Sequence, residues 1–591
     1  MIRENIILAK ELKSLKQRRE TRKKKAGGKK GTSFVVVFIL ILLAFGLVGY
    51  YIYEKKFAPT KVLADKAAYF HVSGDDVALF LNEEQLFNEE DKPVTARAIN
   101  GGLFLPYEWV MSELNRGFYW AKDVNEIFYT LPDRTEKYGL GDTLEDGSTA
   151  FVRIGDTTED LYLNIKFVQK YTDIRYSAHL DDEVKRAFIF NDWNPYESCK
   201  VKGKESVRLL GGIKSEVLTT LKSGDEVKLL EAMENWSKVQ TRDGYIGWLR
   251  NNHLSDKTEV TPESEFKAPE YTHITRNDGS KVVLGFHQIT STAANAYIDD
   301  MVKGVTGMNV IAPTWFILTS DEGDFDNYWT QDYVDNAHAR GYQVWATVNN
   351  FDGGDIDESV FLKSTEIRKK LISNLVDAAV AGGIDGLNID FELIPERLGR
   401  DYVQFMRELA VECRKTGIIL SADCYVPYGY NSYYDLEELG KHIDYVLIMC
   451  YDEHYAGSDA GSVSSISYLN HGISETTKMV PADRVIIAVP FYTRIWMTNE
   501  AGETSSDALG MSDALDWVQN HGVQLSWIGD DIGQNYGEVV EDGITKKVWL
   551  EDRQSMQLKI DAIKEAGCGG VGAWKLGQEP NEIWEIVNIN Q

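Results

Sequence analysis

The chain has 591 residues, of which 43% are hydrophobic and 11% aromatic, and its formal net charge at pH 7 is −28. At roughly 150 residues per domain this length predicts several domains, and the apolar content supports folded cores rather than disorder. Residues 1–32 carry twelve Lys or Arg against three Glu, so the remainder of the chain carries −37. Such an acidic remainder argues against nucleic acid or anionic lipid as the partner of the main domains.

An apolar segment follows the basic tail. Phe34 to Tyr53 are 20 residues without a charge, and a helix of about 20 residues spans roughly 30 Å, the hydrocarbon thickness of a bilayer. We predict a transmembrane helix over residues 33–53, with the tail of residues 1–32 in the cytoplasm. A cleaved signal peptide is the alternative, but its apolar run is usually about 7–15 residues. The expected location is the cell membrane, single-pass, with the later domains extracytoplasmic.

The cysteines and histidines give no sign of a disulfide scaffold or a metal centre. The five cysteines are odd in number and scattered, and no Cys-x-x-Cys pair occurs among Cys199, Cys413, Cys424, Cys450 and Cys568. Buried free thiols are the simpler interpretation. No two histidines have metal-ligand spacing, so we expect no metal and no other cofactor.

Residues 58–192 contain an internal repeat. The segment 103–110, LFLPYEWV, recurs 58 residues later as 161–168, LYLNIKFV, and each copy leads to another apolar strand. The pattern predicts two copies of a small strand-helix-strand unit, and this duplicated α+β module resembles the one named after copper amine oxidase N-termini. The segment has no His cluster, so the resemblance implies no copper.

Residues 199–256 change to short strands punctuated by Gly and Asp. This spacing predicts a small all-β barrel. The segment resembles the bacterial Src-homology-3 type domain, whose members commonly bind peptidoglycan peptides. Residues 257–271 are charged, contain two prolines and are expected to form a linker.

Strand and helix signals alternate from residue 272 to residue 591. The apolar strand runs fall at 281–286, 310–315, 343–348, 387–391, 418–422, 445–449, 485–489 and 570–574. Eight such units favour an α/β fold of the (β/α)8 TIM-barrel type, with chemistry at the strand carboxyl ends. A doubly wound open sheet is the alternative, but no Gly-rich phosphate loop follows any strand. The long spacing before the last strand predicts an insertion at the rim of the cleft.

The fourth of these strands carries an unusual set of polar residues. Leu387, Ile389 and Phe391 alternate with Asn388, Asp390 and Glu392, so one strand face is apolar and the other is polar. Carboxylates are almost never buried unless something pairs or uses them. Glu392 stands nearest the barrel mouth, where a general acid can reach a bound substrate.

This strand resembles the signature of glycoside hydrolase family 18, Asp-x-x-Asp-x-Asp-x-Glu, beginning at Asp385. The match departs once, because Asn388 stands at the second acidic position. Later segments also resemble the family in order: Met449-Cys450-Tyr451-Asp452, Pro490-Phe491-Tyr492-Thr493-Arg494, and Trp574. The Asn variant resembles the branch that includes spore-cortex and other peptidoglycan N-acetylglucosaminidases.

The resemblance implies a role for each matched residue. Glu392 would protonate the leaving oxygen and then activate water, Asp390 would orient the substrate's acetamido N–H, and Tyr451 would hold the acetamido oxygen. The inner acidic residue of the family helps to tune the Asp390 proton, and an amide can hydrogen-bond Asp390 but cannot take its charge. Further sugar contacts would come from Trp574, Met449, Asp452, Tyr492 and Arg494.

Simpler interpretations remain for several of these residues. Asp385 either supports the site or caps a turn beside Gly386. Trp574 could be ordinary core, and Tyr451 with Asp452 could form only a loop hydrogen bond.

The function expected from the sequence is a membrane-anchored glycosidase that cleaves β-1,4 bonds after N-acetylglucosamine in peptidoglycan, by a retaining, substrate-assisted mechanism. The alternatives are a chitinase or chitooligosaccharide hydrolase, and a non-catalytic glycan-binding wall protein. The expected partners are an N-acetylglucosamine-containing glycan and the membrane, with no nucleic acid. The sequence leaves the oligomeric state open.

Overall fold

The computed structural model describes residues 30–155, 157–276, 278–351 and 355–591. These residues form two compact units. One contains the chain up to Leu105 together with Asp173–Phe266, and the other contains Pro106–Thr172 together with Lys267–Gln591. Most of the basic tail predicted over residues 1–32 falls on residues 1–29, which lie outside the described residues, and residues 30–32 begin helix α2.

The first unit begins with the apolar helix α2, Lys30–Lys56. Its stretch Phe34–Lys56 is long and apolar enough to cross a membrane, and its large apolar side chains are exposed rather than packed against the protein. This confirms the single N-terminal apolar helix that the sequence predicts.

The remainder of the first unit contains two sheets. In one, β10 (Arg175–His179), β11 (Arg186–Phe190), β1 (Asp76–Leu81), β3 (Thr95–Ile99) and β4 (Gly102–Pro106) are neighbours in that order. The other holds seven strands of the described chain, from β12 (Tyr196–Lys200) to β18 (Thr258–Val260), in the order β14-β13-β17-β16-β15-β12-β18. The five strands between β12 and β18 in the chain are β13 (Glu205–Arg208), β14 (Val217–Leu221), β15 (Glu226–Ala232), β16 (Trp236–Thr241) and β17 (Ile246–Arg250).

The second unit opens with a small α+β segment. It contains α4 (Tyr107–Glu113), the antiparallel sheet β5 (Phe118–Ala121), β6 (Glu126–Thr130) and β7 (Thr135–Gly139), then β8 (Phe151–Arg153), β9 (Leu161–Asn164) and α5 (Ile165–Tyr171). This segment is bonded to α10 (Gly399–Thr416) of the following domain. The Tyr119 hydroxyl donates to Asp401 at 2.6 Å, and Arg407 donates to the Arg116 carbonyl at 2.9 Å.

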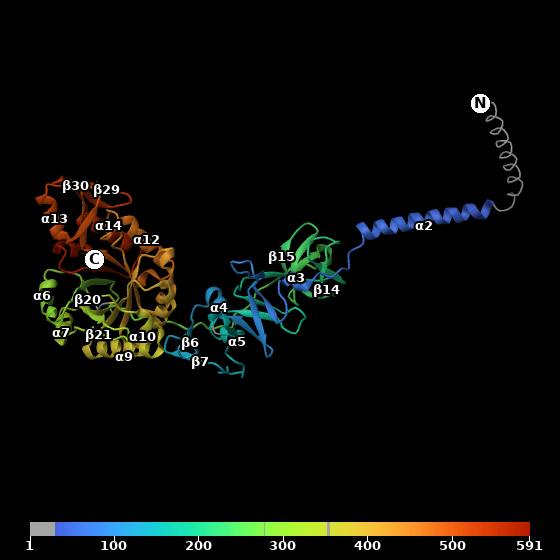
Figure 1. Ribbon diagram of the computed structural model, residues 1–591, viewed down its shortest axis with the longest axis horizontal. Helices are drawn as coiled ribbons and strands as arrows, with labels where there is room; N and C mark the ends of the chain where they lie inside the picture. The colour runs from blue at the N-terminus through green and yellow to red at the C-terminus, as the bar shows by residue number, and fades with distance from the viewer. Residues whose placement is uncertain (1–29, 156, 277, 352–354) are drawn as a thin grey trace, which may run out of the picture. The chain divides into compact units, whose positions relative to one another are not determined.

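A closed parallel barrel forms most of the second unit (Figure 1). In the described chain eight strands close it in the order β19-β32-β26-β25-β24-β23-β22-β20, and β19 pairs with β20. Their bounds are β19 Val282–His287, β20 Val310–Leu318, β22 Gln343–Asn349, β23 Gly386–Asp390, β24 Ile419–Tyr425, β25 Tyr445–Met449, β26 Val485–Pro490 and β32 Gly570–Trp574. All eight strands predicted from the sequence are present, which confirms the TIM barrel.

Helices cover the outside of the barrel and bury the outward side chains of the strands. They include α7 (Gln331–Ala339), α8 (Glu358–Lys363), α9 (Thr365–Gly382), α10, α11 (Leu436–His442), α12 (Ile466–Thr477) and α14 (Arg553–Glu565). A separate cluster fills the barrel interior with Leu284, Phe286, Trp345 and their neighbours. The barrel is therefore a packed core, and the polar inward positions at the strand ends stand out against it.

An insertion follows β26 and precedes α14. Its five-stranded antiparallel sheet runs β28 (Thr504–Gly510), β27 (Tyr492–Thr498), β31 (Ile544–Leu550), β30 (Gln534–Glu541) and β29 (Ser526–Ile528), packed with α13 (Met511–Asn520). Figure 1 shows these elements together in orange and red. The insertion supplies two predicted sugar contacts, Tyr492 and Arg494, from β27.

Candidate active site

The polar face of β23 points into the barrel. Leu387 and Ile389 are fully buried against the outer helices, so the intervening Asn388 and Asp390 face inward. Gly383 ends α9 with φ of 65°, a conformation that Gly adopts without strain. A side chain at Gly386 would collide with the Trp345 ring, 2.7 Å from the added Cβ. These two glycines let β23 enter the barrel close to Trp345.

Glu392 lies two residues beyond the end of β23 and is half-buried. The Asn350 side chain fixes the backbone here: its Oδ1 accepts from the Glu392 N–H at 2.9 Å, and its Nδ2 donates to the Glu392 carbonyl at 3.0 Å. Leu393 then adopts φ of 54°, a left-handed conformation that is costly for a residue with a side chain. The Tyr425 hydroxyl donates to Glu392 Oε2 at 2.7 Å. The carboxylate is therefore held in one orientation at the barrel mouth.

Asn388 is fully buried and hydrogen-bonded on both sides of its amide. Its Oδ1 accepts from the Thr347 hydroxyl at 3.2 Å, and its Nδ2 donates to Ser421 at 3.0 Å and to Asp423 Oδ1 at 2.8 Å. Asn388 thus links three neighbouring strands just below Asp390.

Aromatic side chains and a methionine line the rest of the mouth. Met449, at the end of β25, lies in the interior cluster, and Tyr451, Trp574 and Tyr425 pack against that cluster. Burial raises the pKa of Tyr451 well above its usual value, with smaller contributions from the Asp423 and Asp390 charges. Tyr451 therefore remains a neutral hydroxyl that can donate a hydrogen bond.

Two more predicted residues form a contact at the rim. The Tyr492 hydroxyl donates to Asp452 Oδ1 at 2.6 Å, and the Tyr492 ring lies edge-on to Tyr451 with 6.4 Å between centroids. Arg494 donates to the Ser506 hydroxyl at 3.2 Å within the insertion, while its buried Nε has no hydrogen-bond partner among the described residues.

Asp385 is the one predicted residue that the structure places away from this group. It precedes β23, at the opposite end of the strand from Glu392. Its carboxylate accepts from the Val344 N–H and contacts His338 Nε2, both at 2.8 Å. These contacts tie β23 to β22 and α7 at the base of the barrel, away from the mouth.

Two functional candidates, Asp423 and Tyr425, were missed by the sequence reasoning. Both lie on β24 and alternate with Ser421 on the inward face. The segment Ser421-Ala422-Asp423-Cys424-Tyr425 has the same period-2 alternation as the fourth strand, which could have revealed them.

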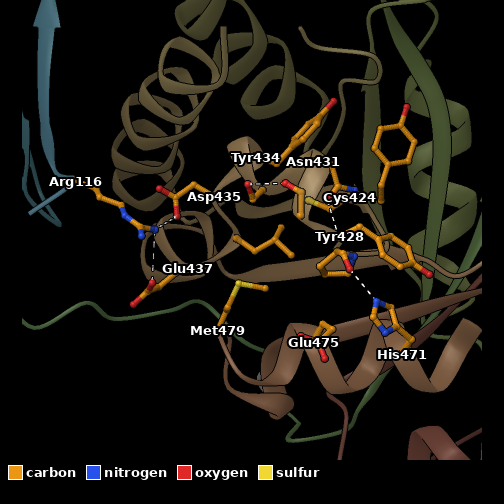
Figure 2. A pocket seen from close by; sticks show the side chains of 15 residues that line it. Arg116, Cys424, Tyr428, Asn431, Tyr434, Asp435, Glu437, His471, Glu475 and Met479 are labelled. Atoms are coloured by element: carbon orange, nitrogen blue, oxygen red, sulfur yellow. Dashed lines mark hydrogen bonds and ion pairs between the residues drawn. The ribbon is translucent and has the colours of Figure 1, made fainter. Parts of the chain in front are cut away.

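A pocket of about 380 Å³ lies beside this strand (Figure 2). Its lining runs from Cys424 and Tyr425 to His471 on α12, and includes Arg116, which bonds to Asp435 at 3.2 Å. Among the residues that the structure describes, neither Asp390 nor Glu392 lines it. The pocket therefore differs from the barrel mouth, although Tyr425 contributes to both.

No cluster of three or more His, Cys, Asp or Glu side chains that could hold a metal ion occurs in the described part of the chain. The side chains gathered at the barrel mouth are carboxyl, hydroxyl and aromatic groups. A parallel barrel with a held carboxylate at a strand end and an aromatic-lined mouth has the parts that acid catalysis on a sugar requires.

The family model described as "Glycosyl hydrolases family 18" matches residues 257–579, more than half of the chain, and the protein belongs to this family. A model described as "Bacterial SH3 domain" matches residues 211–255, within the seven-stranded sheet of the first unit.

Similar proteins occur in Bacillus. The chain is 23% identical over 253 residues to the cortical fragment-lytic enzyme of Bacillus anthracis, covering 41% of this chain and 59% of that one. It is 23% identical over 309 residues to the uncharacterized glycosylase YvbX of Bacillus subtilis (strain 168), covering 50% and 89%. The crystal structure of the Bacillus megaterium QM B1551 spore cortex-lytic enzyme SleL aligns with 18% identity and a TM-score of 0.47, covering 56% of this chain and 77% of that one.

Proposed function

We propose that this protein is a membrane-anchored, extracytoplasmic glycosidase that cleaves peptidoglycan after N-acetylglucosamine. The observation that carries the proposal is the Glu392 carboxylate, held at the end of β23 by Tyr425 at 2.7 Å and by the Asn350 clamp on its backbone. A general acid needs this kind of fixed placement, because proton transfer requires it to lie within hydrogen-bond reach of the leaving oxygen.

The proposed reaction retains the anomeric configuration and uses the substrate's own acetamido group, as family 18 enzymes do. Glu392 donates its proton to the glycosidic oxygen, and that C1–O bond breaks while the acetamido oxygen bonds to C1. Glu392 then takes a proton from water, and the water oxygen replaces the acetamido oxygen at C1. Asp390 orients the acetamido N–H and Tyr451 donates to its oxygen.

The remaining residues of the mouth position the sugar. Trp574 and Met449 offer an apolar floor, which suits the carbon face of a pyranose ring. Tyr492, Asp452 and Arg494 supply donors and acceptors for its hydroxyls. Asp452 holds the Tyr492 hydroxyl at 2.6 Å, so this part of the rim is ordered before substrate arrives.

The proposed substrate and cellular location are supported by a relative of the chain and by its other parts. The Bacillus anthracis relative is named as a cortical fragment-lytic enzyme, and the bacterial SH3 domain at residues 211–255 is of a type suited to the wall. The exposed apolar helix α2 has the length of a membrane anchor. Together these features favour peptidoglycan outside the membrane over soluble chitin fragments.

One digest tests the reaction and the substrate. The full-length chain in detergent is incubated with purified peptidoglycan and, separately, with chitin oligosaccharides, and the anomer formed first is followed by proton NMR. We expect a β-anomer from peptidoglycan. An initial α-anomer would overturn the retaining mechanism, and cleavage of chitin alone would assign the protein to the chitinases. Tight binding of glycan without cleavage would make it a non-catalytic wall protein.

A further inference from the structure

The second acidic position of the family motif holds Asn388, and its surroundings leave this amide no capacity to share a proton. Thr347 donates to its oxygen, while its nitrogen donates to Ser421 and Asp423. An amide cannot carry a negative charge or accept a proton at working pH. Apart from Glu392, which serves as the general acid, a carboxyl group that shares a proton with Asp390 must therefore come from another strand.

Asp423 occupies the matching place on β24. The register pairs Asn388 with Ser421 and Ile389 with Ala422, so the next step along both strands aligns Asp390 with Asp423. Neighbouring strands lie about 4.8 Å apart, and both side chains face the barrel interior. Asp423 is 3% exposed and Asp390 is 6% exposed. Two buried carboxyl groups this close cannot both ionise without a large cost.

We propose that Asp423 is the positioning residue that shares a proton with Asp390, taking the role that an acidic residue at position 388 has elsewhere in the family. This inference rests on the proposed function. In it the carboxyl pair spans β23 and β24 instead of lying along one strand. Asn388 orients the pair by donating to Asp423 Oδ1 at 2.8 Å.

The electrostatic surroundings agree with a protonated Asp423. Burial, and secondarily the nearby Glu392 charge, raise the pKa of Asp423 to about 8, although the Asn388 hydrogen bond lowers it. The titratable groups near it are Asp390 by register, Glu392 beyond the end of β23, Tyr451 and, on the outer side of the strand, Cys424 and the α10 residue Tyr402. No cationic side chain among the described residues stabilises its anion.

The shared proton would move during turnover. When Glu392 has given its proton to the leaving oxygen, Glu392 and Asp390 are both anionic and repel each other. The O–H bond of Asp423 then breaks and an O–H bond to Asp390 forms, which leaves the negative charge on Asp423, farther from the reacting sugar. The reverse transfer restores the resting state, so the cycle is balanced.

Exchanging the two side chains tests this directly. The variants are Asp423→Asn, Asn388→Asp and the double exchange Asn388→Asp/Asp423→Asn, each assayed as the full-length chain on purified peptidoglycan. We expect Asp423→Asn to lower kcat about 10-fold to 100-fold with little change in KM, and to change the alkaline limb of the pH profile. The double exchange places a carboxyl group beside Asp390 again, so its kcat should be at least tenfold higher than that of Asp423→Asn. Cys424→Ser is the matched control, because Cys424 is the adjacent buried residue on the outward face of β24.

A substrate-free measurement separates this inference from the proposed function. Because the folded-state pKa of Asp423 lies above its unfolded value, ionisation should cost stability as pH rises from about 4 to about 8. The melting temperature of Asp423→Asn should therefore rise relative to the unsubstituted chain across this range.

An unsubstituted chain without activity would contradict the proposed function, and the melting difference would still test the carboxyl pair. A melting-temperature difference between Asp423→Asn and the unsubstituted chain that does not change with pH would contradict the proposed carboxyl pair. So would a double exchange no more active than Asp423→Asn when circular dichroism shows both variants folded.

Discussion

The Tyr425 hydroxyl donates a 2.7 Å hydrogen bond to Oε2 of Glu392, joining the ends of β24 and β23 at the barrel mouth. Burial raises the pKa of Tyr425 strongly, and the Glu392 charge raises it further, so the tyrosine stays a donor throughout the working range. Such a donor stabilises the ionised form of the carboxylate.

Tyr425→Phe removes this donor and little else. A hydrogen bond to a charged group contributes about 1.5–3 kcal/mol, so we expect kcat to fall about 10-fold to 100-fold. Without this donor the Glu392 carboxyl stays protonated to higher pH, so the alkaline limb of the pH–rate profile should move to higher pH. Tyr428→Phe is the control, because Tyr428 lines the neighbouring pocket and stacks on His471 without touching Glu392. Equal losses in both variants would contradict a specific role for Tyr425.

The Tyr492 contact with Asp452 should affect substrate binding more than the chemical step. Tyr492→Phe leaves the ring in place but frees Asp452, so KM should rise about five-fold to tenfold while kcat changes less. Tyr536→Phe offers a comparison within the same insertion, since its hydroxyl donates to exposed Glu538. A loss confined to kcat would show that the Tyr492 hydroxyl acts in the transition state instead.

Buried histidines should make the barrel unit sensitive to acid. Burial lowers the pKa of His273, His287 and His442 to about 4. The stability that these neutral histidines contribute is fully present above about pH 6.5 and is lost as pH falls toward 4. His287→Gln should reduce the fall in melting temperature over this range, whereas Tyr428→Phe, which removes no histidine, should leave it unchanged. An identical fall in melting temperature in the unsubstituted chain and both variants would contradict a contribution from neutral His287.

The ion pair between Lys559 and Glu551 lies wholly inside the barrel unit. Both side chains are 1% exposed, and the shortest contact is 2.7 Å. Lys559→Met leaves a buried carboxylate unpaired, which costs about 3–5 kcal/mol. Lys415→Met breaks an exposed pair with Glu412 at 2.8 Å and should cost less than about 1 kcal/mol. Urea unfolding, followed by the tryptophan fluorescence of both variants, measures the difference.

The sequence predicts the barrel well because period-2 alternation and strand spacing are local properties. Leu387 and Ile389 identify the outward face of β23, and that fixes Asp390 as inward without any structure. The link between Asp390 and Asp423 could not be predicted in the same way, because it depends on the register between two strands 33 residues apart. Likewise, nothing local in Tyr119 predicts its hydrogen bond to Asp401, 282 residues later.

A mass-spectrometric digest of purified peptidoglycan by the full-length chain and by Glu392→Gln tests the proposed activity most directly. We predict fragments with N-acetylglucosamine at the new reducing end, and a rate at least 100-fold lower for the variant. New reducing ends on the other sugar, or a Glu392→Gln variant as active as the unsubstituted chain, would contradict it.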